Sequence, residues 1–296
     1  MGESPAAVTG TTVSESAALE DASFWGTQRP PDALLRYENL RNSPIRVCGC
    51  HHLPMRILVA SDLHYSLRQL DWVVTVAGQY DLVVLAGDHL DIRSYVEPDA
   101  QIAAVLEYLK RIAAKTTLAA CSGNHDLNGE NDLEERAATW LQAAREAGVY
   151  VDGTSIVTED VRVTVCPWWD GPRTRERFAA MLAAEASSVD ERMWVWVYHA
   201  PPDRSTTSWT GRRYYGDSDL NGWIAQFRPA LVLCGHVHES PFADEGNWSD
   251  CIGTTWVVNP GRESGPVPAH AIVDTGARFI TWSSATAADD VSFATF

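Results

Sequence analysis

The sequence has few positively charged residues for its size. Its 296 residues include 23 lysines and arginines against 39 aspartates and glutamates, which gives a formal net charge of −16. Long nucleic acids and anionic membranes are attracted by basic surfaces, so we expect neither as a partner. The acidic charge does not exclude a small phosphorylated substrate, because bound divalent cations can reverse the field at one site.

Long apolar runs and a secretory leader are also missing. No stretch reaches the roughly 18 apolar residues that a membrane-spanning helix requires, and the N-terminus lacks a basic start followed by an apolar run. Of the six cysteines, Cys121, Cys166 and Cys234 lie within or at the end of apolar runs, where free thiols behave as small hydrophobes. These features favour a reduced, cytoplasmic protein over a disulfide scaffold, and nothing in them indicates an oligomeric state.

The first 54 residues differ in composition from the rest. They are rich in Ser, Thr, Ala, Glu and Pro and have weak periodicity, so we expect an N-terminal extension that is largely disordered or packs loosely. The segment "CGCHH" at 48–52 offers two thiols and two imidazoles that could bind a soft metal. A linker that happens to contain these residues is the favoured reading, because short motifs often occur by chance.

Residues 55–296 show the periodicity of an ordered α/β domain. Apolar strands at 55–61, 81–87 and 116–123 alternate with helical patterns at 67–78, 98–115 and 132–148, which predicts parallel strands with helical crossovers. A hairpin at 154–169, a helix at 174–187, strands at 193–198 and 230–234 and a short helix at 219–227 follow. Three further segments at 254–261, 269–275 and 278–284 are expected to be antiparallel strands. The order predicts two sheets packed face to face with helices outside.

Polar residues gather where the predicted apolar strands end, and six of the nine histidines lie in these clusters. Ligands of α/β sheets bind at the carboxyl ends of strands, so parallel neighbours would bring the clusters to one edge. Carboxylates, imidazoles and an amide oxygen together suit manganese, iron or zinc, and a carboxylate between two such ions serves in-line phosphoryl chemistry. The clusters are Asp62-Leu63-His64, Gly87-Asp88-His89-Leu90-Asp91, Gly123-Asn124-His125-Asp126, His199, and Gly235-His236-Val237-His238.

Each cluster alone also has an ordinary structural explanation. Asp62 could cap a helix, Asn124 could belong to a simple turn, and His199 could be a hydrogen-bonded core residue. The pair His236 and His238 is more specific, because alternation in an extended segment places both imidazoles on one face. All five clusters in this order favour a metal site.

Together the clusters resemble the signature of the calcineurin-like metallophosphoesterase superfamily. That signature reads D-x-H, G-D-x-x-[D/E], G-N-H-[D/E], a lone H and G-H-x-H. All five blocks occur here in order, and the resemblance extends from about residue 55 to the final strands; "NPG" at 259–261 resembles a turn of many small bacterial members. The matching blocks are "DLH" at 62–64, "GDHLD" at 87–91, "GNHD" at 123–126, His199 in "YHAPP" and "GHVH" at 235–238.

The resemblance implies an αββα sandwich of two mixed β-sheets flanked by helices, with two divalent metal ions (Mn²⁺, Fe²⁺/Fe³⁺ or Zn²⁺). A water or hydroxide held between the ions would attack phosphorus in line. His125 occupies the position of the general acid that protonates the leaving oxygen, and Asp91 matches the acidic position that pairs with this histidine. The implied ligands are Asp62, His64 and His238 for the first ion, Asn124, His199 and His236 for the second, and Asp88 as the bridge.

The resemblance further implies a hydrolase of phosphoric esters, and we expect a phosphodiesterase or phosphatase with a small phosphoester substrate. The shared centre does not choose the substrate, so a nuclease of the same superfamily and a catalytically silent binding or scaffold member are alternatives. The complete ligand set argues against the silent member. In the variable segment 203–222, Arg212, Arg213, Tyr214 and Tyr215 could hold a second phosphate or stack on a base, or form a solvated loop with the aromatic rings packed down.

Two residues of the clusters have no assigned role. His89 lies outside the implied ligand positions and could support the ligands, meet the edge of the substrate or simply belong to a turn. Asp126 either caps the segment that follows it or braces the loop.

Overall fold

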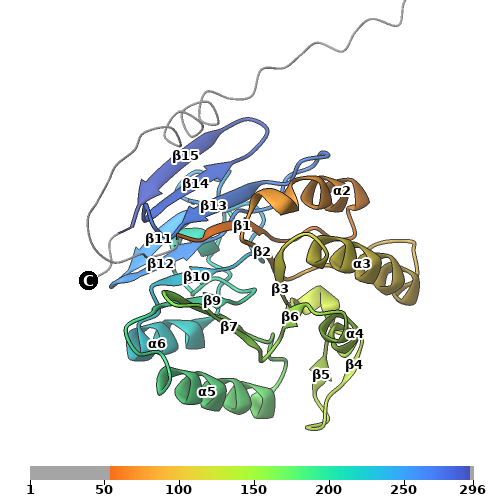
Figure 1. Cartoon of the computed structure of the whole chain (residues 1–296), viewed down its shortest axis with the longest axis horizontal. Coiled ribbons are helices and arrows are strands. Elements are labelled where there is room, and N and C mark those ends of the chain that lie inside the picture. The colour runs from red at the N-terminus through yellow and green to blue at the C-terminus, as the bar shows by residue number, and fades with distance from the viewer. Residues whose placement is uncertain (1–53, 294–296) are drawn as a thin grey trace, which may run out of the picture. The chain divides into compact units, whose positions relative to one another are not determined.

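The computed structural model describes residues 54–293. The extension, apart from Pro54, and the cysteine–histidine cluster at 48–52 lie outside the described residues. Two β-sheets pack face to face, and helices cover the outer face of each sheet (Figure 1). This arrangement is the αββα sandwich of two mixed sheets expected from the sequence.

The first sheet has seven strands in the order β15-β14-β13-β1-β2-β3-β6. Strands β1, β2, β3 and β6 are parallel, whereas β13, β14 and β15 form an antiparallel meander that joins β1 through β13. The strands are β1 Arg56–Ala60, β2 Leu82–Ala86, β3 Thr117–Cys121, β6 Tyr150–Val151, β13 His270–Asp274, β14 Phe279–Ser283 and β15 Ala288–Ser292.

The second sheet has six strands in the order β11-β12-β10-β9-β8-β7. The predicted hairpin is confirmed as β7 and β8. The prediction that 254–261 is an antiparallel tail strand is wrong in part, because β12 pairs in parallel with β10 and antiparallel only with β11. A tight turn at Gly253 (φ 64°) reverses the chain between β11 and β12. The strands are β7 Ser155–Val157, β8 Val161–Val165, β9 Met193–Val197, β10 Leu231–Leu233, β11 Ser249–Ile252 and β12 Thr255–Val258.

The helices begin where the sequence provides a suitable first residue. Pro98 and Pro172 occupy the first turns of α3 and α5, where the backbone N–H that proline lacks would have no acceptor within the helix. The Asp217 carboxylate accepts hydrogen bonds from the first backbone N–H groups of α6. The helices are α2 Leu67–Val76, α3 Pro98–Ala113, α4 Leu141–Glu146, α5 Pro172–Ala186 and α6 Ser218–Phe227, with 3-10 turns at Ala77–Gln79, Asn124–Asp126 and Thr206–Ser208.

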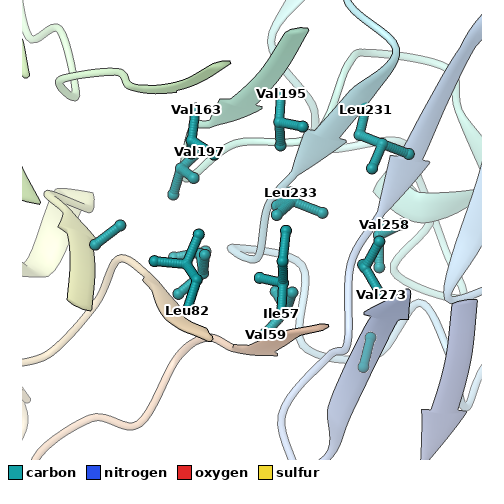
Figure 2. Close-up of a cluster of buried hydrophobic side chains, with 14 of the residues drawn as sticks. Ile57, Val59, Leu82, Val163, Val195, Val197, Leu231, Leu233, Val258 and Val273 are labelled. Atoms are coloured by element: carbon teal, nitrogen blue, oxygen red, sulfur yellow. The ribbon is translucent and has the colours of Figure 1, made fainter. Parts of the chain in front are cut away.

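The main core lies between the two sheets (Figure 2). Successive residues of a strand point to opposite faces, so Ile57 and Val59 of β1 enter this core while Leu58 and Ala60 pack toward the helices of the first sheet. Because both faces of the central strands are buried, the strands read as continuous apolar runs. The outer faces of the sheets pack against α2, α3 and α4 on one side and α5 and α6 on the other.

The predicted helix at 132–148 is wrong over its first half. Residues 129–137 instead contain a small hairpin of β4 (Gly129–Glu130) and β5 (Arg136–Ala137), and α4 begins only at Leu141. The carboxylate of Glu135 accepts hydrogen bonds from the backbone nitrogens of Arg173 (3.0 Å) and Thr174 (2.7 Å) at the start of α5. These contacts with a distant helix override the local helical preference.

Candidate metal centre

The topology brings the polar clusters together. Strands β1, β2 and β3 of the first sheet and β9 and β10 of the second each run directly into one cluster, and within each sheet these strands are parallel. The polar side chains therefore collect at the carboxyl edges of the two sheets. The predicted ligands that are histidines or aspartates fall into two neighbouring groups of possible metal-binding atoms.

The first group contains Asp62, His64, Asp88 and His238, whose ligand atoms lie within 4.8 Å of one another. The Nε2 atoms of His64 and His238 are 3.0 Å apart. The Nε2 atom of His238 is 3.2 Å from Asp62 Oδ1, and that of His64 is 3.6 Å from Asp88 Oδ2. Two carboxylates and two imidazoles thus converge on one point in a largely buried setting.

The second group contains Asp88, His199 and His236. The Nε2 atom of His199 is 3.3 Å from Asp88 Oδ1, and His199 is fully buried. Asp88 belongs to both groups, with Oδ2 toward His64 and Oδ1 toward His199. Its carboxylate therefore lies where a ligand shared by two ions would have to lie.

The donor atoms fit a metal centre. The Nδ1 atom of His199 donates to the carbonyl of Ala86 (2.8 Å), which makes Nε2 the nitrogen that can bind a metal ion; metal-binding histidines are commonly held in this way. Among the described residues, His199 Nε2 and the side-chain oxygen of Asn124 are buried polar atoms without a hydrogen-bond partner. Such atoms are rare in folded proteins, and a divalent cation would satisfy both.

The charges of the centre are strongly coupled. Burial alone would raise the pKa of Asp88, but the neighbouring histidines, His199 first, hold it well below its usual range. Burial alone would lower the pKa of His199, but Asp88 and Asp62 raise it to about 9, so a metal ion that binds Nε2 at neutral pH would displace a proton. Burial lowers the pKa of both His64 and His236 to about 4, so these two rings are neutral at pH 7 and available as ligands.

Four of these residues adopt left-handed backbone conformations that side chains disfavour. The φ angles are 54° at Asp62, 42° at His64, 53° at Asp88 and 69° at His236. Hydrogen bonds between the loops hold this backbone: the nitrogen of His64 donates to the carbonyl of Asp88 (2.9 Å), and that of His236 to the carboxylate of Asp62 (3.0 Å). Backbone strain of this kind collects at functional sites.

Two glycines allow the loops to approach the centre closely. A Cβ atom on Gly123 would lie 2.2 Å from Asp88 Oδ1, and one on Gly87 would lie 2.4 Å from His199 Nδ1. Gly87 also has a φ of 87°, which other residues rarely adopt. The glycines of the "GD" and "GNHD" blocks are therefore required by the packing around the candidate ligands.

Asp126 and His89 brace the loops that carry the ligands. The fully buried carboxylate of Asp126 accepts hydrogen bonds from the backbone nitrogens of His89 (2.9 Å), Leu90 (3.0 Å) and Gly123 (2.8 Å). The ring of His89 donates from Nε2 to the carbonyl of Cys121 (2.9 Å) and packs edge to face on Trp140. Of the roles left open by the sequence, the structure gives both residues a supporting one.

His125 lies beside the centre and is partly exposed. Its backbone nitrogen donates to Asp88 Oδ1 (2.9 Å), and its ring contacts the ring of His64 edge to face, with centroids 4.5 Å apart. Possible ligand atoms of His125, Asp91 and His64 lie within 4.8 Å of one another. Asp91 accepts a hydrogen bond from the backbone of Arg93, and His125 Nδ1 has no partner among the described residues. Asp91 is therefore near His125 without being bonded to it.

The sequence matches the family model of the calcineurin-like phosphoesterase superfamily domain over residues 55–278. The chain belongs to the calcineurin-like phosphoesterase superfamily. It is therefore a hydrolase of phosphoric esters in a superfamily that depends on dinuclear metal centres. The comparison with curated proteins found no match. Within residues 54–293, none of the helices combines the length and apolar content needed to span a bilayer.

Solved structures of low sequence identity share the metallophosphoesterase fold. A dimetal phosphatase from Danio rerio has a TM-score of 0.55 at 9% identity, covering 81% of this chain and 99% of that one. The protein TT1561 of Thermus thermophilus has a TM-score of 0.53 at 16% identity over 81% and 99%. A purple acid phosphatase, PPD1, from yellow lupin seeds has a TM-score of 0.53 at 12% identity over 82% and 54%.

In this metallophosphoesterase, two aromatic residues flank the candidate ligand His236. The ring of Tyr215 stacks on it with centroids 5.0 Å apart, and Trp168 lies 5.4 Å away on centroid distance. The exposed Tyr214 packs on Trp209 instead. The sequence offers both tyrosines, with Tyr214 as the predicted site residue, and no signal in the "RRYY" stretch indicates which of the two meets the centre.

The other predicted substrate residues, Arg212 and Arg213, are exposed. The guanidinium of Arg213 lies over the ring of Tyr215, 5.2 Å from its centroid. Arg213 thus contacts a ring that itself stacks on the candidate ligand His236.

The "NPG" turn has a structural role that the sequence reasoning missed. The buried side-chain nitrogen of Asn259 donates to the carbonyls of Val237 (2.9 Å) and Thr207 (3.0 Å), and its oxygen accepts from the nitrogen of Gly261 (2.9 Å). Asn259 thereby fixes the loop between His236 and His238. In the sequence, the resemblance of this turn to a turn of other family members was the feature that could have indicated this role.

Proposed function

We propose that this metallophosphoesterase hydrolyses a small phosphoester, as a phosphodiesterase or phosphatase, with two divalent ions. Asp62, His64 and His238 would hold the first ion and Asn124, His199 and His236 the second, with Asp88 shared. The observation that carries the proposal is the position of Asp88 in both ligand groups. The unpartnered atoms Asn124 Oδ1 and His199 Nε2 support it. The donor set suits manganese, iron or zinc.

When bound, two such ions would acidify a water molecule and offset charge on the phosphoryl oxygens. In the proposed reaction a water oxygen forms a bond to phosphorus as the bond to the leaving oxygen breaks. His125 gives its proton to that oxygen, a task that histidine suits near neutral pH. Its ring is partly exposed beside Asp88, which allows it to meet the leaving group. Asp91, whose carboxylate lies within 4.8 Å of a ring nitrogen of His125, would orient the ring.

The setting of the enzyme is also part of the proposal. Cys121, Cys166 and Cys234 are buried free thiols, and we infer a reducing, cytoplasmic environment from them. The net charge of −16 disfavours a nuclease that tracks a long strand.

Hydrolysis of two synthetic esters tests the function. The protein is stripped of metal with a chelator, reloaded with manganese and assayed with p-nitrophenyl phosphate and bis-p-nitrophenyl phosphate. We expect p-nitrophenolate release from at least one ester after reloading and none before. If neither ester reacts while metal analysis finds two bound ions, the hydrolase reading for small esters is wrong.

A further inference from the structure

A cavity of about 410 Å³ opens beside the candidate ligand His238. Thr210, Phe242 and Arg262 contribute to its walls, whereas His125 and Asp91 do not line it. The ring of His64 contacts both His125 and His238, with centroid distances of 4.5 Å and 4.9 Å. The cavity therefore meets the centre at His238 and not at His125, the proposed general acid.

Arg262 and Phe242 give this cavity a distinct chemistry. The backbone nitrogen of Arg262 donates to the carbonyl of His238 (3.1 Å), which ties the position of the arginine to the candidate ligand. Its exposed guanidinium makes no ion pair with a described carboxylate. Of the two acidic residues that also line the cavity, Glu263 is engaged by the backbone of Ala285 and Glu239 is exposed. Phe242 is 45% exposed and rests on Trp282. A cation and an aromatic ring thus remain available to a ligand.

We propose that this cavity holds the non-leaving arm of a phosphodiester and that Arg262 selects an arm with an anionic group. The proposal rests on the proposed hydrolase function and narrows it. A phosphomonoester has a single ester arm, which leaves beside His125 and would not enter a cavity at His238. Hydrolysis of the diester consumes one water and yields the alcohol of the leaving arm and the phosphomonoester of the retained arm.

The size of the cavity agrees with such an arm, and Arg262 is the one arginine or lysine among the described residues of its lining, beside Glu239 and Glu263. Pockets for small ligands have volumes of about 300–1,000 Å³, so the cavity can hold an aryl ring or a sugar. The planar guanidinium of arginine binds carboxylates and phosphates through paired hydrogen bonds, which a lysine does not reproduce. Phe242 would pack against the planar part of the arm.

Three diesters that share a p-nitrophenyl leaving group and differ in the retained arm isolate the effect of that arm on hydrolysis. The retained arm is methyl, phenyl or 4-carboxyphenyl. In wild-type enzyme reloaded with manganese, we expect kcat/KM to rise in that order. Arg262→Ala should lower kcat/KM about 10-fold for the carboxyphenyl arm, the scale of one hydrogen bond to a charged group, and less than about twofold for methyl. For the carboxyphenyl diester, kcat/KM of Arg262→Lys should lie between those of wild type and Arg262→Ala. The matched control is Arg145→Ala, an exposed arginine on α4, which should behave as wild type.

A second variant and a binding measurement make the test independent of turnover. Phe242→Ala should lower kcat/KM for the diesters with phenyl and carboxyphenyl arms and leave kcat/KM for the methyl diester unchanged. Calorimetry compares the binding of two phosphonates. In 4-carboxybenzylphosphonate the arm is joined by a carbon–phosphorus bond, which water does not cleave, and methylphosphonate lacks the arm. Arg262→Ala should weaken the binding of 4-carboxybenzylphosphonate about 10-fold and leave the binding of methylphosphonate unchanged.

Equal losses on all three diesters, or faster hydrolysis of p-nitrophenyl phosphate than of any diester, would overturn the assignment of the cavity. If no ester is hydrolysed, the proposed function fails by itself. The calorimetric comparison then still decides whether Arg262 recognises an anionic arm.

Discussion

Replacement of Asp126 should weaken the fold and the candidate metal centre together. This fully buried carboxylate accepts three backbone hydrogen bonds, two from the loop after β2 and one from the loop after β3. In Asp126→Asn the side-chain oxygen can keep the bonds from His89 and Leu90, but the new amide group faces the N–H of Gly123. One hydrogen bond to a charged acceptor is lost and one buried donor is left unpaired.

The loss of one such bond and the unpaired donor should lower the free energy of unfolding by about 2–4 kcal/mol. Asp126→Ala leaves three buried donors unpaired, and at about 1–3 kcal/mol each the cost is about 3–9 kcal/mol. Because whole domains are stable by only about 5–15 kcal/mol, the alanine variant should be marginal or unfolded.

Urea unfolding of the metal-free protein, followed by tryptophan fluorescence, measures these changes. The control is Asp132→Asn, which removes a carboxylate that pairs with Arg177 at the surface and should leave the midpoint close to wild type. The asparagine variant of Asp126 should also bind metal more weakly, because Gly123 adjoins Asn124. If Asp126→Asn and Asp132→Asn unfold at the same urea concentration, the bracing role is wrong.

Three other substitutions test separate parts of the account. His125→Ala should retain metal but slow hydrolysis by about 10²–10⁴-fold, with a smaller loss for esters with good leaving groups; an equal loss for all esters would exclude the acid role. Asp88→Asn should abolish activity and lower metal content, and two tightly bound ions in that variant would contradict the ligand assignment. Burial raises the pKa of Asp152 to about 7, so the folded protein holds a proton there that the unfolded chain releases near pH 4. The stabilising contribution of this proton should therefore be lost as the pH rises from about 4 to 7, and the stability of Asp152→Asn relative to wild type should be higher at pH 8 than at pH 5. A constant difference across this range would contradict the shift.

The sandwich and the gathering of the ligand residues could be predicted because both follow from local pattern and topology. Strands buried on both faces appear as continuous apolar runs, and β1, β2 and β3 each end directly before a polar cluster. Once the strands are read as parallel, Asp62, Asp88 and Asn124 must lie at one edge. The left-handed backbone of Asp62 and Asp88 has no such signature, because it depends on bonds between the loops.

Features set by distant contacts could not be read from the sequence. The segment at 132–140 has a helical pattern, yet Glu135 binds the start of α5, nearly 40 residues later in the chain. The choice between Tyr214 and Tyr215 depends on which ring the loop turns toward His236. The cavity at Arg262 forms between segments near 210, 242 and 262, which only the folded chain brings together.

The central claim is that Asp88 is shared by two ions that together allow phosphoester hydrolysis. It is tested most directly by adding manganese stepwise to chelator-stripped protein while bound metal and p-nitrophenyl ester hydrolysis are measured on the same samples. We expect binding to saturate at two ions per chain and activity to appear as both positions fill. Saturation at one ion per chain, or full activity in the stripped protein, would contradict the claim.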